Sequence, residues 1–181
     1  MNEEIEIRVK LKNPKEAEKK LSSKAKFVEK IDQKDEYYVP AHRDFFEEDP
    51  TSRYLRIRFE EGRNEIGFHV CHYEDGEMVS ADEYETEVED PEEMREILKG
   101  HGMKNKVTVK KRRKVFETEN HEIVIDQVED LGCFMEIEVK KRTKTKRKAK
   151  KGCFKLLKEL DLQHKRIPEG GYCDKLLDKR N

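Results

Sequence analysis

The sequence contains no tryptophan, and none of its apolar runs approaches the ~20 residues that a membrane-spanning helix needs. Residues 1–6 have neither the basic region nor the apolar region of a secretory signal. We therefore expect a soluble, cytoplasmic chain that does not contact a membrane.

Cysteine is sparse and shows no pattern. The spacing Cys-x-x-Cys, the commonest signature of a structural zinc site, does not occur, and no pair of histidines follows at a matching distance. We expect reduced thiols and no zinc site at the four cysteines, which are Cys71, Cys133, Cys153 and Cys173.

Charge of one sign is not in excess. The chain has 40 Lys and Arg residues and 41 Asp and Glu residues, so its net charge is -1 and it is not a globally basic nucleic-acid binder. The segment Lys140–Lys151 is locally basic, with nine Lys or Arg residues in twelve. No aromatic side chain interleaves there to stack on bases, so we favour a solvated loop leading into a helix over an RNA contact.

Apolar residues are also few, at 34% against 45% charged, a composition that would indicate disorder in an unpatterned chain. Here the two kinds alternate: in Glu4–Leu11 every odd position is apolar and every even position is charged. Such alternation predicts a strand with one apolar face. We predict eight strands, at Glu4–Leu11, Glu36–Val39, Leu55–Phe59, Ile66–Tyr73, Glu83–Glu89, Val107–Phe116, Glu122–Val128 and Met135–Lys140.

Helices are predicted between and after the strands. Asn13-Pro14-Lys15-Glu16 and Asp90-Pro91-Glu92-Glu93 each combine a capping residue, a proline at the first helical position and an early glutamate. Two further helices are expected at Ala149–Leu160 and Tyr172–Leu177. The recurrence of an acidic strand before each capped helix indicates an architecture of two halves, without an exact duplication.

Several strands carry like charges two residues apart, on one strand face. Like charges side by side repel, and folding alone does not require them. Strands of opposite sign facing each other would relieve the repulsion and form a site for both a cation and an anion. The pairs are Glu4/Glu6, Arg56/Arg58, Glu85/Glu87, Lys111/Arg113 and Glu136/Glu138.

These patterns predict an α+β fold in which an eight-stranded closed β-barrel spans 1–181 as one domain. Helices would pack outside on the apolar residues, and the charged residues would line an interior wide enough for one small ligand. Clustered carboxylates suit Mg²⁺ or Mn²⁺, and arginine and lysine suit phosphate oxygens. The expected chemistry is therefore phosphoryl or nucleotidyl transfer.

The order of motifs resembles the CYTH superfamily, the triphosphate tunnel metalloenzymes, and within it the class IV adenylyl cyclase-like branch. Glu4-Ile5-Glu6-Ile7-Arg8 is similar to the family's Glu-x-Glu-x-Lys signature, with arginine in place of the terminal lysine. Further blocks are similar in the same order: Leu55-Arg56-Ile57-Arg58, Glu85-Thr86-Glu87, Lys111-x-Arg113, Asp126-Gln127-Val128 with Glu136-x-Glu138, and Tyr172-Cys173-Asp174.

The resemblance implies that the eight-stranded closed β-barrel is antiparallel and forms a tunnel that binds a nucleoside or inorganic triphosphate with Mg²⁺ or Mn²⁺. It also implies roles for these residues. It implies Glu4 and Glu6 as catalytic residues. It implies metal ligands at Glu4, Glu6, Asp126, Glu136 and Glu138. It implies phosphate-binding residues at Arg8, Lys10, Arg56, Arg58, Lys111 and Arg113.

The activity that the resemblance implies is conversion of ATP to cyclic AMP and pyrophosphate. The alternatives are hydrolysis of tripolyphosphate or thiamine triphosphate, and a module that binds polyphosphate or nucleotide without turnover. The family's Thr-x-Lys strand has no lysine here; strand parity favours His69 as its replacement and loop spacing favours His72. Dimerisation through exposed strand edges or helices is left open.

Overall fold

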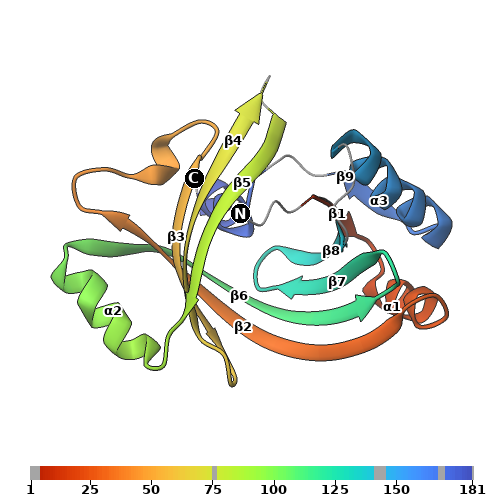
Figure 1. Cartoon of the computed structure of the whole chain (residues 1–181), viewed down its shortest axis with the longest axis horizontal. Helices are drawn as coiled ribbons and strands as arrows, with labels where there is room; N and C mark the ends of the chain where they lie inside the picture. The colour runs from red at the N-terminus through yellow and green to blue at the C-terminus, as the bar shows by residue number, and fades with distance from the viewer. Residues whose placement is uncertain (1–4, 75–76, 141–145, 167–169, 181) are drawn as a thin grey trace. The chain divides into compact units, whose positions relative to one another are not determined.

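The computed structural model describes residues 5–74, 77–140, 146–166 and 170–180 (Figure 1). Within these ranges the strands are β1 (Glu6–Leu11), β2 (Lys26–Pro40), β3 (Arg53–Glu60), β4 (Glu65–Glu74), β5 (Glu77–Glu87), β6 (Met103–Glu117), β7 (His121–Val128), β8 (Gly132–Val139) and β9 (His164–Arg166). The α-helices are α1 (Pro14–Ser22), α2 (Pro91–Gly100), α3 (Lys146–Leu160) and α4 (Tyr172–Arg180), and a short 3₁₀ helix covers Phe45–Glu47.

The strands form one sheet in the order β5-β4-β3-β2-β6-β7-β8-β1-β9. The prediction of a closed eight-stranded barrel is therefore wrong in two respects: among the described residues the sheet has nine strands, and it is not closed. The second edge of β1 pairs with β9, with Leu11 opposite His164. A three-residue strand is too short to show alternation, which is why the sequence did not reveal it.

The chain divides into two compact units. Unit 1 contains the described residues of 32–111 and 170–180, and unit 2 contains those of 5–31 and 112–166. The first acidic strand and its capped helix, β1 and α1, lie in unit 2, and the second pair, β5 and α2, lies in unit 1. The architecture of two halves and the assignment of 1–181 as a single domain stay predictions.

Unit 2 buries the apolar face of β1, β7 and β8 under helices α1 and α3. Strands β1 and β8 pair antiparallel with Ile7 opposite Ile137, so both side chains point to the same face. Leu21 of α1 and Leu157 of α3 complete the core with them, each at most 3% exposed. The alternate residues of these strands, which are mostly charged, lie on the opposite face of the sheet.

Unit 1 contains β3, β4, β5 and parts of the long strands β2 and β6, with α2 and α4. Ile57 of β3 is fully buried, and its neighbours Arg56 and Arg58 point to the other face of the strand. Arg95 of α2 donates two hydrogen bonds to Glu36 of β2, at 2.9 and 2.8 Å, which ties the helix to the sheet.

Both predicted capping motifs are confirmed. The Asn13 side chain accepts a hydrogen bond from the Glu16 amide at 3.2 Å, and Asp90 accepts from the amides of Glu92 and Glu93 at 3.0 Å each. These contacts satisfy amides at the helix start that have no intrahelical partner, and each proline occupies a position where its missing N–H costs nothing.

Each helix in the described ranges is too short or too polar to span a lipid bilayer.

Truncation of a side chain on the buried apolar face should lower the free energy of unfolding. Ile137→Ala should lower the free energy of unfolding by roughly 2–5 kcal/mol, because Ile137 is fully buried and its loss leaves a cavity. Ile97→Ala on α2 is the matched control, since Ile97 is 48% exposed and its truncation should cost about 0.5 kcal/mol or less. Urea denaturation measures both, and equal losses would contradict the assignment of the core.

Candidate functional site

The charged face of unit 2 is organised around Arg113 of β6. Its guanidinium donates two hydrogen bonds to the carboxylate of Asp126 of β7, from Nε at 2.8 Å and from Nη2 at 2.6 Å. Nη2 also donates to Glu136 of β8 at 2.8 Å. Asp126 is fully buried, so this bidentate pair is shielded from water and geometrically defined.

Arg8 of β1 extends the same cluster. Its Nε donates to the second carboxylate oxygen of Glu136, and its Nη2 donates to Glu6 at 3.0 Å. The register places Glu6 opposite Glu138 and Arg8 opposite Glu136, so four of the predicted site residues share one face. Lys10 follows on that face, with its ammonium 5.6 Å from the centroid of the Phe134 ring.

The charged face of unit 1 is organised around a buried carboxylate, Asp35 of β2. Arg58 donates to it from Nε at 2.7 Å and from Nη2 at 3.0 Å, and the Lys111 ammonium lies 3.3 Å from Oδ2. Burial alone would raise the pKa of Asp35, but the charges of Lys111 and Arg58 outweigh it and hold the pKa well below its usual range. Asp35 is therefore ionised and anchors two predicted phosphate-binding residues.

Arg56 lies next to this group and contacts two carboxylates. Its Nη2 donates to Glu85 of β5 at 2.6 Å and to Glu65 of β4 at 3.4 Å. Burial and the nearby charge of Glu85 raise the pKa of Glu65. Among the described residues, the buried Nε of Arg56 has no hydrogen-bond partner, which leaves one donor of a predicted phosphate-binding side chain unsatisfied.

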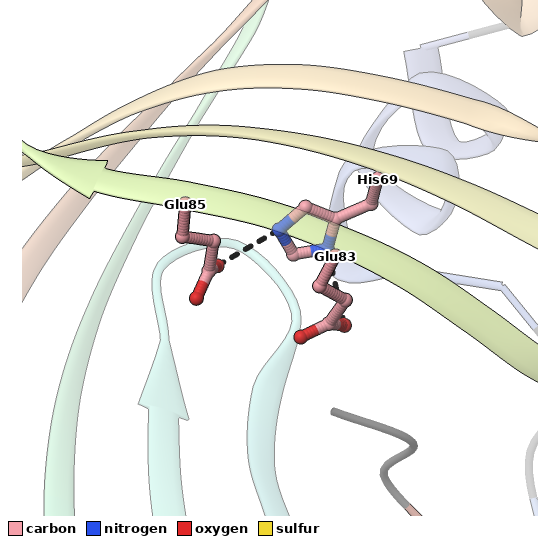
Figure 2. A group of neighbouring side chains, drawn as sticks. All are labelled: His69, Glu83 and Glu85. Atoms are coloured by element: carbon pink, nitrogen blue, oxygen red, sulfur yellow. Dashed lines mark hydrogen bonds and ion pairs between the residues drawn. The ribbon is translucent and has the colours of Figure 1, made fainter. Parts of the chain in front are cut away.

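His69 of β4 lies between two carboxylates of β5 (Figure 2). Its Nδ1 is 3.3 Å from Glu83, and its Nε2 is 2.8 Å from Glu85. Burial lowers the pKa of His69, but the hydrogen bonds to the two glutamates outweigh it and raise the pKa above its usual value. The same hydrogen bond from His69 lowers the pKa of Glu85.

The sequence left open whether His69 or His72 takes the place of the family's lysine, and the two side chains lie in different surroundings. His69 lies opposite Tyr54, which is two residues from Arg56 on the same strand. The side chains of His69 and Arg56 therefore point to the same face of the sheet, as strand parity indicated. His72 is three residues further along the strand and pairs with Asp82 at 2.9 Å. Of the two, His69 therefore occupies the charged face.

Helix α4 supports the basic strands of unit 1. Asp174 accepts a hydrogen bond from the Tyr54 hydroxyl at 2.9 Å, and the Lys111 ammonium lies 5.6 Å from the centroid of the Tyr172 ring. The Tyr172-Cys173-Asp174 block at the end of the chain therefore contacts the strands that carry Arg56, Arg58 and Lys111.

In unit 2 the structure brings five of the predicted site residues together: Glu6, Arg8, Arg113, Asp126 and Glu136. Lys10 and Glu138 lie on the same face. In unit 1 it places Arg58 and Lys111 beside Arg56. Glu4 lies outside the described residues. The roles of all these residues stay predictions. Sequence reasoning assigned no role to Asp35, Glu65 or Glu83, although strand register would have placed Asp35 opposite Arg58 once the pairing of β2 with β3 was known.

The donor chemistry fits a hard divalent ion in unit 2, where the predicted ligands are carboxylate oxygens. In this structure the carboxylates of Glu6, Asp126 and Glu136 are bound by Arg8 and Arg113. Within the described ranges, the group of three ligand-bearing side chains close enough to share one ion is a different one: His69, Glu83 and Glu85, with ligand atoms within 4.8 Å of one another.

These paired arginines and carboxylates are carried by one sheet with helices, so the fold is of the α+β class. The model of the CYTH domain family matches residues 2–170. The chain belongs to the CYTH family, which confirms the resemblance seen in the motifs. A protein of Methanocaldococcus jannaschii named "Putative adenylate cyclase" is 35% identical over 136 residues, which is 75% of each chain.

The chain is also similar to solved structures. A Pyrococcus horikoshii protein is 30% identical with a TM-score of 0.77, covering 97% of this chain and 99% of its own. A second protein from that organism is 27% identical with a TM-score of 0.76, covering 96% of this chain and 98% of its own. An adenylyl cyclase-like protein of Hippeastrum, at 19% identity and a TM-score of 0.69 over 93% of each chain, shares the fold.

The buried anchor of unit 1 yields a stability prediction. Asp35→Asn should lower the free energy of unfolding at pH 7 by roughly 3–5 kcal/mol, because it leaves Arg58 and Lys111 without their buried counter-charge. Since the folded pKa of Asp35 is depressed, its stabilisation is complete above its ordinary pKa near 3.8 and is lost as the pH falls below that value. Urea unfolding at pH 7 and pH 2.5 measures the loss.

The difference between the wild type and Asp35→Asn should therefore shrink in acid. Asp178→Asn on α4 is the control, because Asp178 is exposed and belongs to the same unit. A difference that is the same at both pH values would show that Asp35 is not the ionised anchor.

Proposed function

We propose that this chain is a divalent-metal-dependent enzyme acting on a triphosphate, and that its reaction is that of a class IV adenylyl cyclase: ATP to cyclic AMP and pyrophosphate. Membership of the CYTH family and the name of the Methanocaldococcus relative support this proposal. The observation that carries it is the pairing of arginines with carboxylates on both charged faces.

These pairs are suited to exchange with a metal–triphosphate complex. In unit 2, Arg8 and Arg113 together satisfy both oxygens of Glu136. A polyphosphate alone would take the arginines and leave buried carboxylates unpaired, which is costly. A polyphosphate that carries its own divalent ion offers a partner to each charge, so both sets can exchange without leaving an unpaired ion.

The phosphate-binding residues that we propose are the ones predicted from the sequence. Arginine forks bind phosphate oxygens through two donors, whereas lysine acts as a compact charge. Among the described residues, the buried Nε of Arg56 lacks a hydrogen-bond partner, and a phosphate oxygen is an acceptor that would supply one. Arg8 and Lys10 would serve in unit 2 with Arg113, and Arg56 in unit 1 with Arg58 and Lys111.

The metal ligands that we propose are Glu6, Asp126, Glu136 and Glu138, together with Glu4, for Mg²⁺ or Mn²⁺. When bound, such an ion neutralises charge on the phosphate oxygens and so favours attack at phosphorus. Asp35, which is 1% exposed, keeps Arg58 and Lys111 in place before substrate arrives, so the chain need not order them at the moment of binding.

In the cyclase reaction, the ribose 3′ oxygen forms a bond to the α-phosphorus while the bond from that phosphorus to the bridging oxygen breaks. The hydroxyl proton is released and pyrophosphate leaves. Water attacking the terminal phosphate instead would give the triphosphatase alternative. The Hippeastrum protein of the same fold is described as having a dominant triphosphatase activity, so the fold is compatible with either outcome.

One assay separates the candidates. The protein is incubated with ATP, tripolyphosphate or thiamine triphosphate, each with Mg²⁺ or Mn²⁺, and cyclic AMP, pyrophosphate and phosphate are quantified. Cyclic AMP with equimolar pyrophosphate supports the cyclase. Phosphate from any substrate without cyclic AMP supports the triphosphatase, and tight tripolyphosphate binding without product supports a binding module.

Glu6→Gln should reduce turnover by at least ~100-fold while the fold is kept, because it removes a proposed metal ligand and the charge that binds it. Glu159→Gln is the matched control: Glu159 lies on α3, in the same unit, and its side chain is 49% exposed. Circular dichroism checks the fold of both variants. Full activity of Glu6→Gln would contradict the role proposed for the acidic strand β1.

A further inference from the structure

His69, Glu83 and Glu85 lie outside the ligand set proposed above, and their arrangement has a chemical requirement of its own. A neutral imidazole carries one N–H, so it can donate to one acceptor only. Here both ring nitrogens face carboxylate oxygens, Nδ1 at 3.3 Å from Glu83 and Nε2 at 2.8 Å from Glu85 (Figure 2). In a neutral His69, the ring nitrogen without a hydrogen would therefore point its lone pair at a carboxylate. A proton or a metal ion between that nitrogen and the carboxylate removes this repulsion.

The surrounding charge also calls for a cation. Three carboxylates gather here, those of Glu65, Glu83 and Glu85, and Arg56 is the guanidinium that contacts two of them. Arg63 reaches Glu65 only at 3.7 Å and is 64% exposed, so it contributes little. A dication at the histidine would balance the group.

The backbone leaves room for such an ion. Gly67 lies opposite Glu85 in the strand register and two residues before His69. A Cβ at position 67 would lie 3.1 Å from Nε2 of His69 and 3.4 Å from both Cγ and Oε1 of Glu85. Glycine therefore keeps open the space where the imidazole and the carboxylate meet.

The ligand atoms are close enough to converge. They lie within 4.8 Å of one another, whereas two ligands bound to one ion at ~2.0–2.2 Å lie at most about 4.4 Å apart. The closure needed is a few tenths of an ångström, which side-chain rotation supplies. The side chains of His69 and Glu83 are 14% and 17% exposed, so the group is largely shielded from solvent without being sealed from it.

We propose that His69, Glu83 and Glu85 form a second divalent-metal site, in unit 1, which binds transition-metal ions such as Zn²⁺ in preference to Mg²⁺. The imidazole decides the preference: nitrogen ligands suit zinc and its neighbours, while Mg²⁺ favours all-oxygen sites. The site combines one imidazole nitrogen with two carboxylates and leaves further positions for water or a ligand.

Zinc binding without nucleotide tests this proposal independently of the enzymatic one. The full chain, with ring nitrogens labelled with ¹⁵N, is titrated with Zn²⁺ while calorimetry gives the affinity. We expect the ring-nitrogen signals of His69 to shift at stoichiometric Zn²⁺ and not at equal Mg²⁺. Absence of that shift at saturating Zn²⁺ overturns the site.

Three variants locate the ion. Glu83→Gln should weaken the His69-linked binding by at least ~10-fold, since loss of even an indirect partner of a metal ligand costs that much. His69→Lys keeps a cation between the glutamates, so the fold should be retained while this binding is lost. His72→Gln is the control on the same strand, because His72 pairs with Asp82 instead, and its affinity should equal that of the wild type.

Zinc affinity unchanged in both Glu83→Gln and His69→Lys would assign the zinc to other residues and refute the proposal. Glu6→Gln separates the two metal sites: it should leave the His69 shift intact even where turnover is lost. The His69 shift without any turnover would support the zinc site and contradict the enzymatic proposal. Turnover without the His69 shift would support the enzymatic proposal and contradict the zinc site.

Discussion

The structure depends on the pairing of arginine forks with carboxylates across neighbouring strands. Arg113 with Asp126 and Arg58 with Asp35 are bidentate pairs whose acid partner is at most 1% exposed. Charges buried this deeply are tolerated only when each has a partner of good geometry. The pairs therefore restrict which strands can be neighbours and in which register, while the apolar residues on the opposite face supply most of the burial energy.

The same pairing sets what the sheet can bind. A face that already balances its own charges gains little from a simple anion or a simple cation. Either ion would displace one member of an arginine–carboxylate pair and leave the other member without a counter-charge. Under the function proposed above, such a face would accept a ligand that brings both charges. The selectivity for a metal-bound polyphosphate that we propose would then be a property of the face as a whole, shared between Glu136, Arg8 and Arg113 in unit 2.

Much of this was predictable from the sequence, and the failures have physical causes. Alternation located eight strands because a period of two is visible in any run of about five residues. It underestimated β2, whose first half has mixed polarity, and it missed β9, which has three residues. That the sheet stays open in the described residues was not predictable, because edge pairing depends on residues distant in sequence. The roles of Asp35, Glu83 and His69 needed the register, which brings residues from separate strands together.

Strand β5 has a consequence for how copies of this chain meet. It stands at one end of the strand order, and Asp82, Glu83, Glu85 and Glu87 crowd its second half. An exposed strand edge invites pairing with another chain, and like charges along it discourage that pairing. Two copies approaching through β5 would bring acidic rows together, so repulsion would keep this edge from seeding aggregates, and added salt would weaken that protection.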